Sequence, residues 1–138
     1  MIIYIDENMP SHLAAGFNML QKPEGLKTGL DIEVKFLLEN FDRGSKDVDW
    51  IPKVGIEGSC VITQDINISR RRNEIDLYKK HGVGMFFLRG PNKKKGLSIW
   101  EMTQCLAKNW EEICYKACKE KRPFAYEFTL HKNMKKLK

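Results

Sequence analysis

The alternation of apolar and polar positions predicts strands separated by helices along most of the chain. The first strand, Ile2–Ile5, is wholly apolar and too short for a buried helix, which is typical of a strand covered on both faces of a parallel sheet. Similar short runs occur later in the chain, at Ile32–Leu37, Ser59–Thr63 and Val83–Leu88. The run from Ile32 alternates with Glu33 and Lys35, which indicates a less fully buried position in the sheet.

Helical periodicity lies between these runs. Apolar residues recur every three or four positions from Pro10 to about Gln21, and Pro23 and Gly25 are predicted to end that helix. A short helix opens at Asp47–Pro52 and ends near Gly55 or Gly58. A charged surface helix follows at Arg70–Lys80, and Gly82 is its predicted stop.

The most regular helix is predicted from Ile99. Ser98 and Glu101 have the spacing of a capping box, in which each residue bonds the backbone N–H of the other. One face then stays apolar for five turns, through Ile99, Met102, Leu106, Trp110, Ile113 and Ala117.

Four alternations of strand and helix predict a single α/β domain at residues 1–128, with helices on both faces of a mostly parallel sheet. Pro123–Phe128 alternates and is predicted to be a last edge strand. The basic C-terminal tail at 129–138 is expected to be flexible.

Charge and composition indicate which class of partner and which cellular compartment to expect. The chain of 138 residues carries 24 Lys and Arg against 18 Asp and Glu, a formal charge of +6, which favours a polyanion such as nucleic acid. It has no apolar run of bilayer-spanning length and no signal-peptide pattern at its start, so a cytoplasmic protein is expected, with no membrane partner. The four cysteines lack a C-x-x-C pair and are expected to be free thiols rather than zinc ligands.

Acidic residues fall at equivalent ends of the predicted elements. Asp6 ends the first strand, Asp65 follows the third, and Asp47 and Asp49 begin the helix before it. In a parallel sheet all of these lie on the carboxyl edge, where open α/β sheets place their ligands. Clustered carboxylates bind hard cations such as Mg²⁺ or Mn²⁺, and a bound cation promotes phosphoryl displacement.

Each acid also has a purely structural interpretation, which the spacing leaves open. Asp47 or Asp49 could be a helix N-cap, and a cap at Asp49 would put Pro52 in the first turn, where its missing N–H does no harm. Asp65 could be a turn residue and Glu7 a solvated neighbour.

Several segments together resemble the PIN-like domains, with the closest likeness to the small VapC-type toxin ribonucleases of prokaryotic toxin–antitoxin modules. The likeness spans roughly residues 1 to 128. It is carried by Asp6-Glu7-Asn8, Asp47-x-x-Trp50-Ile51, Val61-Ile62-Thr63-Gln64-Asp65, Arg70-Arg71-Arg72-x-Glu74, Met85-Phe86-Phe87-Leu88 and Arg122-Pro123-Phe124.

The resemblance implies a three-layer α/β/α fold and a Mg²⁺- or Mn²⁺-dependent endoribonuclease, a hydrolase whose metal-activated water cleaves RNA phosphodiester bonds. It implies a toxin inhibited by a cognate antitoxin protein. The implied catalytic residues and metal ligands are Asp6, Asp47 and Asp65, with Asp49 as the alternate at the helix start. Glu7, Asn8 and Thr63 would support them.

Asn67 departs from the family pattern, because many PIN-like sites have a further acid at this point. An amide oxygen can coordinate a hard ion but brings no charge, so one firmly held ion is expected. The departure also keeps open an alternative, a catalytically inactive PIN-like module that binds RNA or protein. A phosphoacceptor receiver domain is disfavoured, because the fourth predicted strand ends in Arg89 rather than lysine.

Two basic clusters are expected near the acidic edge, at Arg70, Arg71 and Arg72 and at Lys93, Lys94 and Lys95. They would bind RNA phosphates, although a run of lysines is also typical of a solvated loop. The sequence leaves open which RNA is cleaved and whether the protein forms a homodimer.

Overall fold

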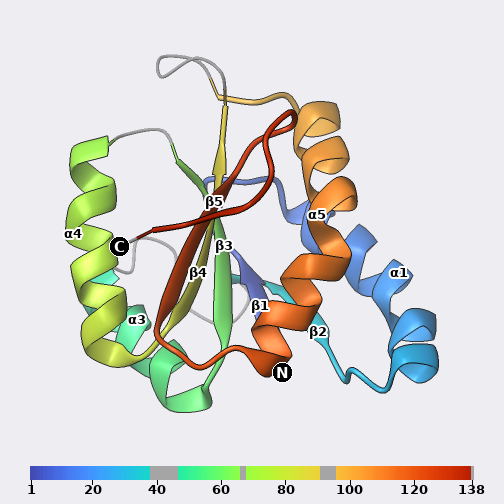
Figure 1. Cartoon of the computed structure of the whole chain (residues 1–138), viewed down its shortest axis with the longest axis horizontal. Helices are drawn as coiled ribbons and strands as arrows, with labels where there is room; N and C mark the ends of the chain where they lie inside the picture. Colours follow the sequence, from blue (N-terminus) through green and yellow to red (C-terminus); the bar gives the residue numbers. More distant parts are fainter. Residues whose placement is uncertain (38–46, 66–67, 91–95, 138) are drawn as a thin grey trace.

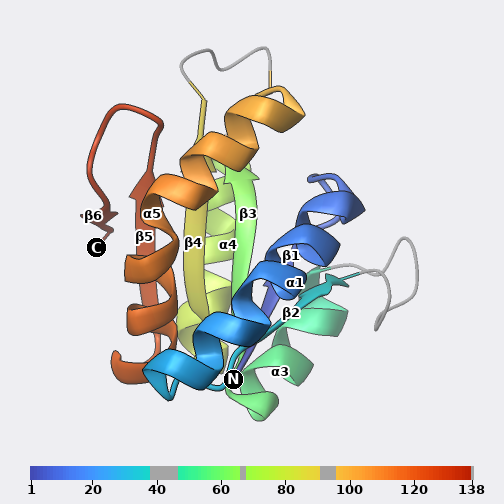
Figure 2. The same cartoon turned by 90° about the vertical axis from the view of Figure 1, so that its right-hand side faces the viewer.

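A six-stranded sheet forms the centre of the molecule (Figures 1 and 2). The structure is a computed structural model of the whole chain and describes residues 1–37, 47–65, 68–90 and 96–137, except for the side chains of residues 47, 48, 65, 68–72 and 74. The strand order is β2-β1-β3-β4-β5-β6, and all pairs are parallel except β5 with β6. The strands are β1 (Ile2–Ile5), β2 (Glu33–Phe36), β3 (Cys60–Asp65), β4 (Gly84–Arg89), β5 (Phe124–Phe128) and β6 (Lys135–Lys136).

Helices cover both faces of the sheet, as predicted. Helices α1 (Ser11–Thr28) and α5 (Ile99–Lys119) pack on one face, and α3 (Asp47–Glu57) and α4 (Ile68–His81) pack on the other (Figure 1). Successive residues of a strand point to opposite faces, so Ile3 and Ile5 join the core beneath α1 and α5 while Tyr4 joins the core beneath α3 and α4. The expected three-layer α/β/α architecture is confirmed.

Helix α1 is longer than predicted, because Pro23 lies inside it and does not end it. Proline removes one N–H donor and crowds the preceding turn, yet the helix continues to Thr28 and ends at Gly29, whose φ of 76° is left-handed. The buried side chain of Gln21 explains part of this persistence. Its Oε1 accepts a hydrogen bond from Trp110 Nε1 on α5 at 2.8 Å, which holds the turn before the proline on α5. After the proline, the Gly29 N–H donates to the Gly25 carbonyl at 2.9 Å and closes the helix.

Two predicted helix ends are confirmed. At the start of α5, Ser98 Oγ accepts from the Glu101 N–H at 3.2 Å, and Glu101 Oε1 accepts from the Ser98 N–H at 2.9 Å. At the end of α4, Gly82 has a φ of 72°, a conformation that favours glycine. Among the residues that the structure describes, no helix is long and apolar enough to cross a membrane.

Strand β5 is not the edge strand that the alternation predicted. The tail returns along it as β6, in an antiparallel register that pairs Tyr126 with Lys136 and Glu127 with Lys135. Leu137 extends the contact, since its N–H donates to the Ala125 carbonyl at 2.7 Å. Residues 135–137 of the tail are therefore part of the sheet rather than a flexible appendage.

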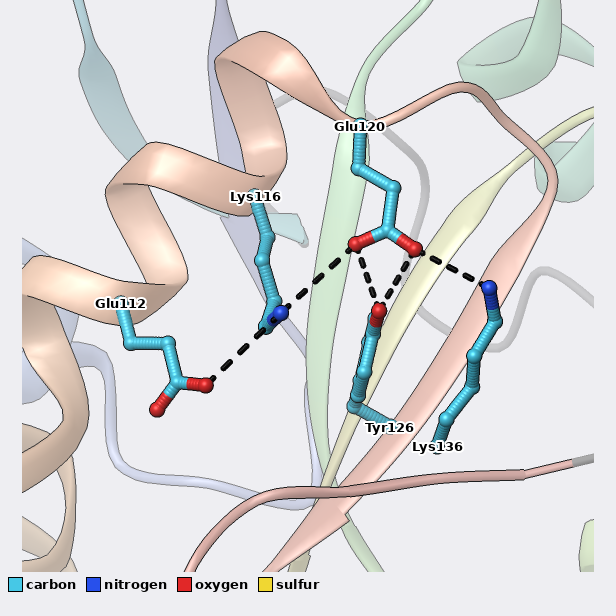
Figure 3. Close-up of polar contacts among 5 residues, drawn as sticks. All are labelled: Glu112, Lys116, Glu120, Tyr126 and Lys136. Carbon is cyan, nitrogen blue, oxygen red and sulfur yellow. Dashed lines mark hydrogen bonds and ion pairs between the residues drawn. The ribbon is translucent and has the colours of Figure 1, made fainter.

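A cluster around Glu120 fixes this returning strand to the end of α5 (Figure 3). The Tyr126 hydroxyl lies 2.5 and 2.6 Å from the two carboxylate oxygens of Glu120. Lys136 Nζ donates to Glu120 Oε1 at 3.2 Å, and Lys116 Nζ lies 4.4 Å from the centroid of the Tyr126 ring. Glu112 extends the cluster through an ion pair with Lys116 at 3.7 Å. The Glu120 cluster thus joins one helix and two strands.

Two helical glycines should respond oppositely to alanine. A Cβ at the exposed Gly16 meets nothing within 4 Å, so Gly16→Ala should raise the free energy of unfolding by about 0.5–1 kcal/mol. A Cβ at Gly55 on α3 would overlap the carbonyl oxygen of His81, so Gly55→Ala should lower it by about 1–3 kcal/mol. Urea denaturation of both variants measures the difference. Equal stabilisation by both would contradict the close packing of α3 on α4.

The Glu120 cluster predicts a loss of stability at alkaline pH. Burial and the hydrogen bond and negative charge of Glu120 raise the pKa of Tyr126 to about 12, against about 10 in an unfolded chain. The folded state therefore keeps this proton, and the stability it contributes is complete below about pH 10 and is lost as the pH rises towards about 12. Urea denaturation at about pH 9 and about pH 11 should show a smaller decline for Tyr126→Phe than for the wild type. Tyr115→Phe, at an exposed tyrosine, is the control. If the free energy of unfolding declined as little in Tyr115→Phe as in Tyr126→Phe, the assignment of the effect to Tyr126 would be contradicted.

Candidate functional site

Strands β1 and β3 lie side by side at the point where the strand order reverses direction. From β1 the chain crosses through α1 to β2 on one side, and it later enters β3 on the other side through α3. In open parallel sheets such a switch point forms a crevice outside the carboxyl ends of the strands, where ligands bind. Asp6 directly follows β1 and Asp65 ends β3, so the two acids stand at the two sides of this crevice.

Asp6 is buried, with 6% of the residue's surface exposed, and both of its carboxylate oxygens accept hydrogen bonds. Oδ2 accepts from the Thr63 hydroxyl at 2.6 Å, and Oδ1 accepts from the Glu7 N–H at 2.7 Å. The Asp6 N–H donates to the Ile62 carbonyl at 3.0 Å. Hydrogen bonds of this length to a carboxylate are charge-assisted, so the orientation of Asp6 is fixed by the protein itself.

Asn8 and Gln64 hold the two strand ends together. Asn8 Nδ2 donates to the Gln64 carbonyl at 2.9 Å, and Asn8 Oδ1 accepts from the Gln64 N–H at 3.3 Å. Gln64 returns the contact, since its Nε2 donates to the Asn8 carbonyl at 3.3 Å. Its Oε1 also accepts from the Leu97 N–H at 2.8 Å, just before α5. A supporting role for Asn8 was predicted from the sequence, whereas that of Gln64 was not.

Gly96 is the residue that lets the chain approach Gln64 so closely. A Cβ at this position would lie 2.9 Å from Gln64 Oε1, which is closer than side chains tolerate. The local signal for the contact was a glycine two residues before the N-cap Ser98 of α5, and this signal does not identify a partner 32 residues earlier in the chain.

Strand alternation places several site positions on one face of the sheet. Thr63 belongs to the same face as Val61, which packs in the core beneath α3 and α4 together with Tyr4. Position 65 lies two residues after Thr63 on β3 and therefore belongs to the same face. Helices α3 and α4 begin on this face at the same edge of the sheet, because both run opposite to the strands.

The start of α3 corrects the structural interpretation of Asp49. The helix begins at Asp47, so Asp49 is its third residue and not an N-cap. Pro52 is its sixth residue, beyond the first turn where the capping hypothesis would put it. Helical spacing aligns position 47 with the buried Trp50, whereas Asp49 is exposed and aligned with Ile56, which is 88% exposed.

Several predicted site residues lie outside the part of the chain that is described. Asn67 and the lysines at 93, 94 and 95 do so entirely, and the side chains of Asp47, Asp65, Arg70, Arg71 and Arg72 do so as well. The backbone of the three arginines lies in the first two turns of α4, at the carboxyl edge of the sheet. Among the described residues, no group of three His, Cys, Asp or Glu side chains gathers to hold a metal ion.

Arg89 is a neighbour of the site that the sequence analysis considered only for its difference from lysine. It ends β4 directly opposite Asp65 in the register of β3 and β4. Its Nη1 lies 3.7 Å from Glu127 Oε2 on β5. Strand pairing puts the Arg89 cation between position 65, a predicted ligand, and the carboxylate of Glu127. Spacing along the chain does not reveal this arrangement.

The cysteines take no part in this edge. All four are free, as predicted, and Cys60, Cys105 and Cys114 are buried. Burial raises the pKa of each of these three thiols to about 12, so they stay protonated and unreactive at neutral pH.

Comparison with known proteins gave one finding. A family model described as PIN like domain matches residues 1–90, from β1 through the last residue of β4 and Gly90. Neither the curated proteins nor the solved structures gave a significant match. The matched range contains Asp6, Asp47 and Asp65, and it ends before α5.

The hydrogen bond between Thr63 and Asp6 should contribute measurably to stability. Thr63→Val keeps the shape but removes the donor to a buried carboxylate, so the free energy of unfolding should fall by about 1.5–3 kcal/mol. Thr63→Ser keeps the hydroxyl and is the matched control, with a smaller loss from the missing methyl group. Urea denaturation compares the two variants. A loss for Thr63→Val no larger than that for Thr63→Ser would show that the hydrogen bond is energetically unimportant.

Proposed function

Because its residues 1–90 match the family model, the chain belongs to the PIN-like domain family, and we propose that it is a metal-dependent endoribonuclease. The observation that carries the proposal is the Asp6 carboxylate. It is buried at the switch point of the sheet, with its orientation fixed by Thr63 at 2.6 Å and by the Glu7 N–H at 2.7 Å. A buried carboxylate with a fixed orientation, at the switch point of a parallel sheet, is suited to binding a cation.

The donor set at this edge fits Mg²⁺ or Mn²⁺. Both ions prefer carboxylate and amide oxygens, and the predicted ligands at this edge are three carboxylates and one amide. We assign Asp6, Asp47 and Asp65 as the ligands, with Asn67 as a neutral further donor. Position 47 is preferred over Asp49 because it is aligned with the buried face of α3.

The ion, when bound, would lower the pKa of a water molecule and offset charge on the phosphate during in-line displacement. The protein would orient the reacting groups. Thr63 holds Asp6 in one orientation, and Asn8 and Gln64 keep the ends of β1 and β3 at a fixed separation. The backbone start of α4 puts Arg70, Arg71 and Arg72 at the edge where an RNA backbone would cross, and Lys93, Lys94 and Lys95 would add to that charge.

The toxin role is proposed from the sequence resemblance to VapC-type ribonucleases. In this role a cognate antitoxin protein would bind the enzyme and suppress cleavage of cellular RNA. A small gene for a DNA-binding protein next to the gene for this chain would support it.

Asn67 supports a second candidate function, a catalytically inactive module that binds RNA or a protein. Where many family sites have an acid, this chain has an amide without charge. The two candidates differ in their response to a divalent ion, because only an acidic site that binds the ion gains stability from it.

We expect Mg²⁺- or Mn²⁺-dependent cleavage of single-stranded RNA that Asp6→Asn abolishes, since the amide cannot supply the ligand charge. Gel analysis of RNA fragments measures the activity, and urea denaturation checks that the variant is folded. Cleavage that survives in folded Asp6→Asn would contradict the assigned site.

Binding of the ion has a readout independent of activity. Mn²⁺ at about 100 times its dissociation constant should stabilise the wild type by about 2.7 kcal/mol, and Asp6→Asn should show no such gain in thermal melting. Asp47→Asn and Asp49→Asn are the matched pair for the helix start, and only the first should reduce the response. An unchanged melting temperature for the wild type at millimolar Mn²⁺ would favour the inactive module.

A further inference from the structure

The C-terminal part of the chain builds a cleft at the same edge of the sheet as the candidate site. Residues 129–134 leave β5 at its carboxyl end and return as β6, forming an arm beside the start of α5 (Figures 1 and 2). A cleft of about 550 Å³ lies between this arm, the end of β4 and the first turn of α5. We call it the C-terminal cleft.

Short contacts connect the C-terminal cleft to the candidate site. Leu97, which lines the cleft, donates its N–H to Gln64 Oε1 at 2.8 Å. Gln64 is bonded in turn to Asn8, two residues after Asp6. Arg89 lines the cleft from β4 and is paired in register with Asp65. A ligand in this cleft would therefore lie next to one bound between β1 and β3.

The cleft lining combines three kinds of groups. Arg89, Lys132 and Lys135 bring positive charge, and Leu97 and Leu130 bring apolar surface. Glu127 brings a carboxylate: its side chain is 15% exposed, and its Oε2, 3.7 Å from Arg89 Nη1, has almost no exposed surface, which leaves Oε1 as the oxygen for a ligand. Cations suit a phosphate, apolar walls suit the flat face of a base, and a carboxylate accepts from the amino or imino groups of a base edge.

The volume also suits a nucleotide. Pockets for small ligands usually measure about 300–1000 Å³, and this cleft lies within that range. Of its lining, only Arg89 and Gly90 lie within the residues matched by the family model, which ends at residue 90. The cleft is therefore built mainly by the part of this chain that the family model does not describe.

We propose that the C-terminal cleft binds one nucleotide of an RNA strand next to the cleaved phosphate and selects its base. This inference rests on the proposed ribonuclease function for its substrate. Lys132 and Lys135 bind the phosphate, Leu97 and Leu130 contact the base, and the carboxylate of Glu127 recognises its edge. The Glu120 cluster holds the two strands at the root of the arm, since it contains Tyr126 of β5 and Lys136 of β6, so the cleft is formed before RNA arrives.

The test uses the four 5′-nucleoside monophosphates as probes, titrated into the full-length protein without divalent metal and followed by NMR of its amide groups. We expect saturable shifts at residues 97–101 and 127–133, with one base preferred. Lys132→Ala should weaken binding about threefold to fivefold. Lys119→Ala removes an equally exposed lysine far from the cleft lining, at the last residue of α5, and should leave binding unchanged.

A second variant tests whether the cleft selects the base. Glu127→Gln keeps the shape of the side chain but replaces an acceptor-only group with a mixed donor and acceptor, so the order of preference among the four nucleotides should change. A purely structural role of Glu127 would weaken all four equally. The same variant should shift the preferred cleavage position in an RNA of mixed sequence.

The proposal is overturned if no nucleotide gives saturable shifts, if the shifts lie away from the cleft, or if Lys132→Ala and Lys119→Ala bind alike. These outcomes are distinguishable from failure of the ribonuclease function. Nucleotide binding is measured without metal and without cleavage, whereas the ribonuclease proposal fails when folded Asp6→Asn still cleaves RNA.

Discussion

The hydrogen bond from Thr63 to Asp6 joins two strand ends that are 57 residues apart in the chain. Together with the Glu7 N–H it provides hydrogen-bond donors to a buried carboxylate, and burial of the charge without donors would be strongly unfavourable. Asn8 and Gln64 bond the same two strand ends. Together these hydrogen bonds fix the separation of β1 and β3 at the carboxyl edge of the sheet. The candidate site and the start of α5 depend on this junction, since Gln64 continues it to Leu97.

Much of the fold follows from local patterns. Buried apolar runs, the capping box at Ser98 and the stop at Gly82 predicted the central strands and two helix ends, because each depends on residues close together in sequence. The predictions that failed depend on distant contacts. Helix α1, which Gln21 bonds to α5, continues past Pro23, and β5 is covered by a strand that two lysines form.

Part of the candidate site could be predicted too, because some of its features depend on residues that are close together in the sequence. Polar residues at strand ends identify an edge of the sheet, so Asp6, Asn8 and Thr63 could be proposed as site residues from the sequence. Gln64 and Arg89 were missed as site neighbours, because their roles arise from the pairing of β1 with β3 and of β3 with β4. Strand order is a property of the whole sheet, which no short motif contains.

The short strand β6 has a consequence for self-association. An open sheet edge offers unpaired backbone groups to the edge of another molecule, and charged outer strands discourage such addition. Here the outer strand on one side is Lys135–Lys136. On the other side the Val34 N–H of β2 already donates to Asn18 Oδ1 at 3.0 Å, and Glu33 and Lys35 flank it. Charged residues on both outer strands therefore discourage extension of the sheet by a second copy of this chain.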